Sequence, residues 1–393
     1  MNWFEANPRK ARWLVALLCI LLLEGLTRIL VGAGLLPYRT YPTSRVPQYW
    51  ASIDPVVGVW RYPNATLVQK ERCSTVTYRS NSAGARDPER LQRSTAERRF
   101  VVLGDSFIEG YGLDAEDRVT NLLEARTGVE FLNFATSGGF GTIQEWLLYT
   151  SKVQGYDHTD VLLFILPAND FEDNDPQEFP AKSYRPFLRP QGEGYEVYYT
   201  VPWERRVRDE RRLSTVIKNT IDNHLYLANV LRWATSELKG GVKAGTKEQR
   251  LALNGSDYDR HSPADFRVMT YALDQLVRAA GERRVFMVTI PTENDFAAAR
   301  RGETSRLVGE MTAFAARYPN VRYRDLLPDF LDDAGTSGQS FTDYLLECDN
   351  HWGKLGNKLV AERLESWFFA ADQSAVVTPR SGPAHARRSH VLD

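Results

Sequence analysis

Side chains suited to acyl transfer follow three predicted strands of this sequence. Ser106 ends the run Gly104-Asp105-Ser106 and offers a hydroxyl nucleophile. Gly138 and Gly139 lie in a loop after the next strand, where bare backbone N–H groups can stabilise a developing oxyanion. Asn169 follows the third strand and offers a side-chain amide to the same charge. Such a set of groups still requires a general base.

His351 is the best-placed base among the six histidines of the chain. It follows the last strand and precedes the last helix, which puts it at the carboxyl edge of a parallel sheet, where ligands bind. Asp349 can orient its imidazole and stabilise the protonated form. The rival interpretations are a helix-start residue for His351, a helix N-terminal charge for Asp349, and Asp343 as the true acid. The other histidines lie in the tail, before a strand or in an insertion: His385, His390, His158, His224 and His261.

Three further polar residues adjoin these motifs. Asp105 and Asp170 are expected to be structural hydrogen-bonding groups that support the site. Arg86 is either a surface charge or a residue at the rim of the active site, and the sequence leaves both interpretations open. No carboxylate or histidine pair has metal-ligand spacing, so neither a metal nor a cofactor is expected.

Five apolar runs, each read as a strand, alternate along the sequence with segments of helical periodicity. These strands and helices must position the candidate catalytic groups. The predicted strands are 99–103, 129–134, 160–166, 284–290 and 321–326. The predicted helices are 114–127, a helix ending near 154, 264–281, 303–318 and 354–371. Strands that alternate with helices in this way predict an α/β fold with a parallel, doubly wound, five-stranded sheet.

The N-terminus predicts a single membrane span. Residues 13–36 form an apolar stretch of about two dozen residues, long enough for a tilted helix across a bilayer core roughly 30 Å thick. Basic residues before it place the N-terminus in the cytoplasm and the rest of the chain outside. Glu24 and Arg28 are four residues apart and can pair on one helix face. The alternative is a cleaved signal peptide with its cleavage site at Val31-Gly32-Ala33.

Composition narrows the class of protein. The chain has 393 residues, 43% of them hydrophobic and 25% charged, which is typical of a folded protein. Its net charge of -1 argues against a nucleic-acid binder. Three cysteines exclude a disulfide-dense scaffold and a Cys-only zinc site.

The expected organisation has five parts. These are a cytoplasmic N-terminus (1–12), a transmembrane signal-anchor (13–36), an extension packed on the main domain (37–98), the main domain (99–372) and a disordered tail (373–393). An insertion at 173–262 interrupts the main domain. It contains an aromatic cluster, interpreted as packing or as a platform for sugars, and one amphipathic helix over 213–238.

The four motifs together resemble the SGNH, or GDSL-type, hydrolase superfamily. The matching blocks are 104–110, 133–141, 168–170 and 349–352. The resemblance implies a flavodoxin-like sheet, with Ser106 as nucleophile and His351 as base. It also implies an oxyanion hole formed by the Ser106 N–H, a glycine of the second block and Asn169. Gly139 opens the Gly-Phe-Gly-Thr run and is preferred to Gly138 and Gly141.

The blocks also depart from the family pattern. Pro167 stands where a glycine is usual, and Cys348 occupies the usual place of the acid, three residues before the histidine. An aspartate two residues before a His-Trp pair is instead similar to alginate O-acetylation proteins of this superfamily. The segment 81–87 resembles one found in membrane-anchored bacterial members.

Cys73 and Cys348 lie beyond the predicted span, while Cys19 lies within it. An oxidising compartment permits a disulfide, and an unpaired thiol beside an active site would be a liability there. A Cys73–Cys348 bridge would brace the histidine loop against the N-terminal extension. Two separate buried thiols are the alternative.

These features lead us to expect an extracytoplasmic serine esterase held in the bacterial inner membrane by one span, with its catalytic domain in the periplasm. Its expected substrates are small esters or O-acyl, including O-acetyl, groups on an envelope or secreted glycan. This substrate class follows from location and resemblance. An O-acetyltransferase that uses the same residues is one alternative, and a catalytically silent glycan-binding module of an export complex is another. Envelope polysaccharide machinery is the expected partner.

Overall fold

The computed structural model describes residues 3–36, 48–50, 52–70, 73–179, 183–240 and 255–376 of the chain. Its centre is a five-stranded parallel sheet made of β5 (Arg99–Leu103), β6 (Glu130–Asn133), β7 (Asp160–Ile165), β10 (Arg284–Thr289) and β11 (Val321–Asp325). The strand order is β11-β10-β7-β5-β6, which is the flavodoxin-like order. The predicted doubly wound α/β fold is therefore confirmed.

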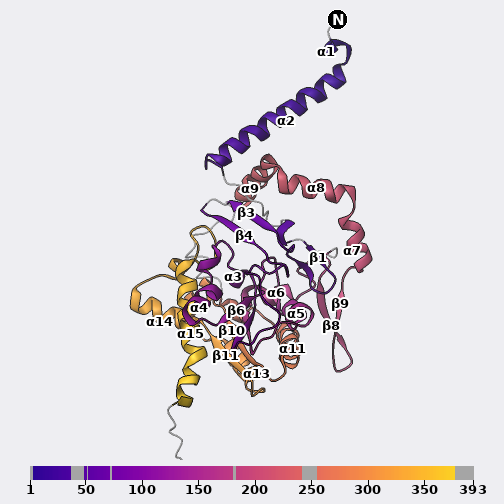
Figure 1. The fold of residues 1–393 in the computed structure, drawn as a ribbon. Helices are drawn as coiled ribbons and strands as arrows, with labels where there is room; N and C mark the ends of the chain where they lie inside the picture. The colour runs from indigo at the N-terminus through magenta and orange to yellow at the C-terminus, as the bar shows by residue number, and fades with distance from the viewer. Residues whose placement is uncertain are drawn as a thin grey trace, which may run out of the picture.

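Both faces of the sheet are buried, and helices cover each of them (Figure 1). Val101 and Leu103 of β5 point into one core, while Phe100 and Val102 point into the other. The first core is covered by α5 (Thr142–Leu148), which continues as the π-helical turn η3 (Tyr149–Val153), by α11 (Pro263–Ala280) and by α13 (Arg306–Ala315). The second is covered by α4 (Val119–Thr127), α12 (Glu293–Arg300), α14 (Leu327–Ser337) and α15 (Lys354–Val376). Burial on both faces explains why these strands are continuous apolar runs.

Short helices follow the carboxyl ends of the strands. α3 (Ser106–Glu109) follows β5, and α6 (Pro167–Asp173) follows β7. The predicted helix 114–127 is divided into a 3-10 turn, η2 (Ala115–Asp117), and α4. Another 3-10 turn, η5 (Phe341–Tyr344), leads into the loop that carries the candidate histidine.

The N-terminal extension packs on the main domain as two hairpins. β1 (Ser52–Asp54) pairs with β2 (Gly58–Trp60), and β3 (Thr66–Lys70) pairs with β4 (Thr75–Arg79). A 3-10 turn, η1 (Gln48–Trp50), precedes them. Trp60 belongs to the first core of the sheet, so the extension completes the main domain.

The insertion forms a β-hairpin and three helices. The hairpin is β8 (Pro186–Gln191) with β9 (Gly194–Tyr199), and the helices are α7 (Trp203–Glu210), α8 (Leu213–His224) and α9 (Tyr226–Gly240). After 241–254, which lie outside the described residues, the 3-10 turn η4 (Asp257–Asp259) returns the chain to α11. Tyr184 and Tyr199 stack on each other, and each hydroxyl donates to a carbonyl of the β1–β2 turn, which favours packing for these aromatics.

Two predicted boundaries are wrong. The amphipathic helix expected over 213–238 is divided, because Leu225 is extended with ψ 113°. The break lets the first N–H groups of α9 bind Glu24, as described below. The last helix also continues to Val376, so 373–376 are helical rather than part of a tail, and 377–393 lie outside the described residues.

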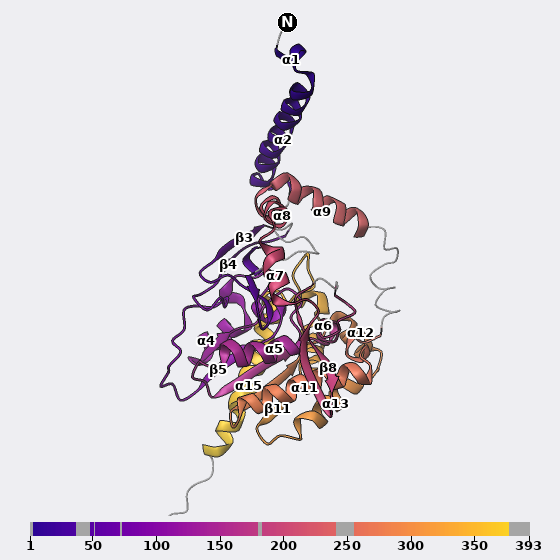
Figure 2. The same cartoon turned by 90° about the vertical axis from the view of Figure 1, so that its right-hand side faces the viewer.

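The helix α2 (Pro8–Gly32) follows a short α1 (Trp3–Ala6) and projects from the rest of the molecule (Figures 1 and 2). It has 25 residues, and an 18-residue window within it has a mean hydropathy of 2.4, enough by length and composition to cross a membrane. The predicted pairing of Glu24 with Arg28 is confirmed at 2.8 Å.

Candidate active site

Ser106 is the first residue of α3, directly beyond β5. Asp105 caps this helix, because its carboxylate accepts the backbone N–H of Phe107 at 3.0 Å. Gly104 has a φ of +153°, and a Cβ there would lie 3.2 Å from Cβ of Phe164 on β7. A glycine is therefore suited to the tight exit from the strand. The turn leaves Ser106 half-buried at the carboxyl edge of the sheet.

His351 lies between Ser106 and Asp349. Its Nε2 is 2.7 Å from the Ser106 hydroxyl oxygen, and its Nδ1 is hydrogen-bonded to Oδ1 of Asp349. The same carboxylate oxygen accepts the backbone N–H of His351 at 3.0 Å, which fixes the loop. With Nδ1–H donated to the carboxylate, Nε2 is free to accept the serine proton.

Aromatic rings hold the imidazole in place. The rings of Phe107 and Tyr111 lie 4.8 and 4.9 Å from the ring of His351, centroid to centroid. Asp343 is engaged elsewhere, because its carboxylate accepts the N–H of Ser340 at 2.7 Å and caps η5. That bond lowers the pKa of Asp343. The local structure therefore places Asp349, and not Asp343, against the imidazole.

The candidate oxyanion donors come from neighbouring segments. The Asn169 amide nitrogen, in the first turn of α6, is 3.5 Å from the carboxylate of Asp105, next to Ser106. Gly138 and Gly139 have φ of +107° and +70°, which an L side chain would strain. A Cβ on Gly139 would lie 2.8 Å from the carboxylate of Asp173. The glycine loop is thus packed closely on the end of α6.

Glu109 joins the nucleophile helix to this glycine loop, and the sequence reasoning missed it. It is fully buried and accepts the backbone N–H of Ser137 at 2.6 Å. It also accepts from Arg61 at 2.9 Å and from the indole of Trp50 at 2.9 Å. Burial alone would raise the pKa of Glu109, but the Arg61 and Arg86 guanidiniums lower it. An acid three residues after Ser106 in an otherwise apolar turn was the available signal.

Arg86 is buried, so the interpretation as a surface charge is wrong. Its hydrogen bonds to Glu109, Gly110 and Leu113 are to backbone carbonyls, and none of them supports a place at the rim of the active site. Only 2% of Arg86 is exposed. Its guanidinium donates to the carbonyls of Glu109 and Gly110 at 3.0 and 2.7 Å and stacks over the ring of Tyr78. Arg86 therefore holds the chain where it leaves the nucleophile helix.

Four acids are buried behind the glycine loop and α6: Asp105, Glu145, Asp170 and Asp173. Asp170 accepts the N–H of Leu166 at 2.8 Å, as expected for a structural group. Burial raises the pKa of Asp105 and of Asp173 to about 6. The charge of His351 partly offsets the rise at Asp105. Burial, and then the neighbouring carboxylates, raise the pKa of Glu145 and of Asp170 well above the ordinary range.

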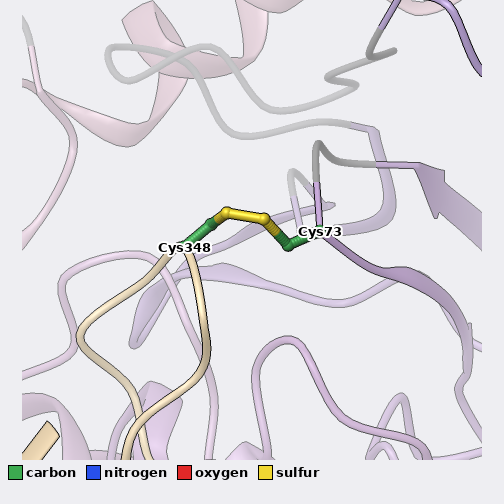
Figure 3. The surroundings of a disulfide bond; sticks show 2 residues. All are labelled: Cys73 and Cys348. Carbon is green, nitrogen blue, oxygen red and sulfur yellow. A yellow bond between two sulfur atoms is a disulfide. The ribbon is translucent and has the colours of Figure 1, made fainter.

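A disulfide joins Cys73 to Cys348, with their Cα atoms 6.0 Å apart (Figure 3). Cys73 lies between β3 and β4, and Cys348 directly precedes Asp349. The bond fastens the loop of the candidate acid and base to the N-terminal extension. Within the described part of the chain, no group of three or more His, Cys, Asp or Glu side chains is arranged to hold a metal ion.

Comparisons with known proteins give only distant likenesses. No family model matches the chain, and no curated protein matches it. Among solved structures it is similar to a lipolytic protein of the G-D-S-L family from Veillonella parvula, with 12% identity, TM-score 0.34, and coverage of 69% of this chain and 97% of that one. It is also similar to a carbohydrate esterase family 2 enzyme from Corynascus thermopiles (Myceliophthora fergusii), with 14% identity, TM-score 0.37 and coverage of 80% and 81%.

A third similar structure is a lipase/acylhydrolase from Enterococcus faecalis, with 13% identity, TM-score 0.34, and coverage of 70% of this chain and 96% of that one. Likenesses this distant do not assign an activity, so the functional proposal is drawn from the geometry of the site.

Proposed function

We propose that the chain is a membrane-anchored serine esterase of the SGNH type that hydrolyses O-acyl esters of carbohydrates. The observation that carries this proposal is the hydrogen-bonded series from Ser106 through His351 to Asp349 at the carboxyl edge of the sheet. A nucleophile, a base and an orienting acid in this order form the constellation of serine hydrolases.

The chemistry proceeds in two steps. Ser106 Oγ attacks the ester carbonyl carbon while its proton passes to Nε2 of His351. The oxyanion is stabilised by the N–H groups of Ser106 and Gly139 and by the Asn169 amide. The alcohol then leaves with the proton from Nε2, and an acyl-serine remains. Water gives its proton to Nε2 and attacks the acyl-serine, which releases the acid and restores Ser106.

Fluorophosphonate labelling and ester hydrolysis test the nucleophile. We expect the full chain in detergent to be labelled once and to hydrolyse p-nitrophenyl acetate, and Ser106→Ala to lose both properties with an unchanged melting temperature. Loss of one triad member typically lowers the rate by several orders of magnitude. Ser366→Ala, on the exposed surface of α15, is the matched control. Failure of the wild-type chain to label would favour a silent glycan-binding module.

The substrate class rests on the predicted location outside the membrane and on the resemblance of the four motifs. O-acetylated glycans and esters of longer acyl chains should be compared, with release of the free acid as the readout. The Asp349-His351 spacing followed by Trp352 also favours a second candidate, transfer of the acyl group to a sugar hydroxyl. An acceptor sugar that suppresses acid release and becomes acylated would establish transfer instead of hydrolysis.

The location is tested by reporter fusions. A reporter enzyme active only outside the cytoplasm, fused after position 41, should be active, and a reporter active only inside should be silent. Arg9, Lys10 and Arg12, in the first turns of α2 ahead of its apolar run, support this orientation. The reverse pattern would overturn the extracytoplasmic location and the glycan substrate with it.

A further inference from the structure

The helix α8 presents an apolar face to the surroundings of the protein. Leu213, Val216, Ile217 and Ile221 are 73, 48, 51 and 37% exposed. Their spacing of three and four residues places them on one side of the helix. Leu225, at the corner with α9, and Leu231 on α9 continue the exposed apolar surface.

Little of the described protein covers α8. Of its residues with described side chains, Thr215 is half-buried and the rest are exposed. A helix of twelve residues is marginal in water without packing. A contiguous exposed apolar surface of this kind marks a contact with a partner or a membrane.

The corner between α8 and α9 is fixed to the end of α2. The carboxylate of Glu24 accepts the first N–H groups of α9, from Tyr226 at 3.0 Å and Leu227 at 2.8 Å. Arg28 pairs with Glu24, donates to the carbonyl of His224 at 2.8 Å and lies over the ring of Tyr226. Backbone groups of the insertion thus form hydrogen bonds with both members of the charged pair in α2, Glu24 and Arg28.

The arrangement places α8 and α9 where a membrane surface would lie. In both views they lie across the end of α2, between it and the globular part (Figures 1 and 2). The segment 203–240 also has eight basic residues against five acidic ones, although the whole chain has a net charge of -1. Most of the excess comes from 203–212, directly before α8, which has five basic residues against three acidic ones, whereas α8 itself has one of each, Lys218 and Asp222. An exposed apolar face beside a basic segment is typical of helices that lie in the membrane interface.

We propose that α8 and the first turns of α9 lie in the outer interface of the membrane that α2 spans, with Val216, Ile217 and Ile221 in the lipid. The inference rests on the anchoring role proposed above for α2. The lipid surface supplies the cover that α8 lacks in the protein. A second copy of the chain, joined through α8, is the competing occupant.

This contact would fix how the catalytic part stands on the membrane. A single span leaves a domain free to tilt, whereas two contacts joined through Glu24 and Arg28 restrict it. The β3–β4 hairpin lies at the same end of the globular part as α8 and α9 (Figures 1 and 2). Because Cys73 of this hairpin is bonded to Cys348, the loop of His351 is tied to the membrane-facing end.

Depth-dependent fluorescence quenching tests the proposal on the full chain in lipid nanodiscs. A polarity-sensitive NBD dye is attached, without reductant, to Ile217→Cys or to Asn219→Cys in a Cys19→Ser background, so that the disulfide stays closed. Asn219 lies on the opposite side of α8 and is the matched control. With spin-labelled phospholipids, we expect at least about threefold stronger quenching at position 217 than at 219.

The native Cys19 separates the two proposals. A dye on Cys19, in the middle of α2, should be quenched by lipids spin-labelled deep in the acyl chain. Quenching at Cys19 with equally weak quenching at 217 and 219 would overturn the interfacial helix and leave the anchor intact. Absence of quenching at Cys19 would overturn the anchor. Oxidative crosslinking between two Ile217→Cys chains that replaces lipid quenching would assign the face to a second copy and overturn the lipid contact.

Discussion

The carboxylate of Glu109 accepts the backbone N–H of Ser137 at 2.6 Å, which connects the helix that begins with Ser106 to the loop of candidate oxyanion donors. The same carboxylate is paired with Arg61 from the N-terminal extension. A change at Glu109 therefore acts on the spacing between nucleophile and oxyanion donors without touching substrate. In the proposed mechanism Glu109 is therefore a positioning residue.

Glu109→Gln is expected to lower kcat more than it raises KM. Misplacement of a catalytic group by about 1 Å can lower a rate about a hundredfold. The variant also leaves Arg61 buried without its charge partner, which typically costs about 3–5 kcal/mol of stability. Steady-state hydrolysis and the melting temperature measure the two effects. Glu365→Gln removes an exposed partner of Arg126 and should change neither appreciably. An unchanged kcat in Glu109→Gln would contradict the positioning role.

The fold and the central site residues could be predicted from the sequence because parallel strands bring their carboxyl ends to one edge. Ser106 and Asn169 closely follow the neighbouring strands β5 and β7, so topology alone places them together. His351 lies beyond β11, after α14 and η5, and its motif next to the last helix was the signal for it. The supports of the site could not be predicted in this way. Arg61 and Trp50 reach Glu109 across 48 and 59 residues of sequence, from an extension with little periodicity.

The break between α8 and α9 had an equally remote cause. Apolar periodicity runs on through Leu225, and the group that binds the new helix start is Glu24, 202 residues away from Tyr226. Periodicity describes which face of a helix is apolar, and it does not report a distant carboxylate that favours a second helix start. The local pattern therefore correctly predicted that this segment is helical, but it wrongly predicted one continuous helix.

The proposed acid, Asp349, should matter less for activity than the proposed base, His351. His351→Ala removes the proton acceptor, while Asp349→Asn removes only the group that orients and stabilises it. We expect the order of kcat/KM to be wild type, then Asp349→Asn, then His351→Ala, with Asp343→Asn close to wild type because it caps η5. Hydrolysis of p-nitrophenyl acetate measures this order. A silent Asp349→Asn together with a crippled Asp343→Asn would reassign the acid.

The disulfide should stabilise the fold and hold the histidine loop. The bond closes a loop spanning 275 positions, for which chain-entropy models give on the order of 5 kcal/mol. The paired variant Cys73→Ser with Cys348→Ser is expected to melt at a lower temperature and to lose more kcat than Cys19→Ser. Thiol counting on the denatured, non-reduced full chain should give one free thiol, that of Cys19, and three after reduction. Three free thiols before reduction would contradict the bond.

The buried acids behind the glycine loop should make stability fall as pH rises. Glu145 is fully buried, and burial followed by the charges of Asp170 and Asp105 raises its pKa in the folded chain. Above pH 4.5 the unfolded chain releases this proton while the folded chain retains it, so the folded state loses relative stability as pH rises toward the folded pKa.

Glu145→Gln removes the group that causes this loss of stability. The melting temperature of Glu145→Gln minus that of wild type should therefore increase as pH rises above 4.5, until the pH passes the folded pKa. Glu282→Gln, an exposed carboxylate after α11, controls for simple removal of charge. A difference that stays constant or decreases with pH would show that Glu145 does not retain its proton in the folded chain.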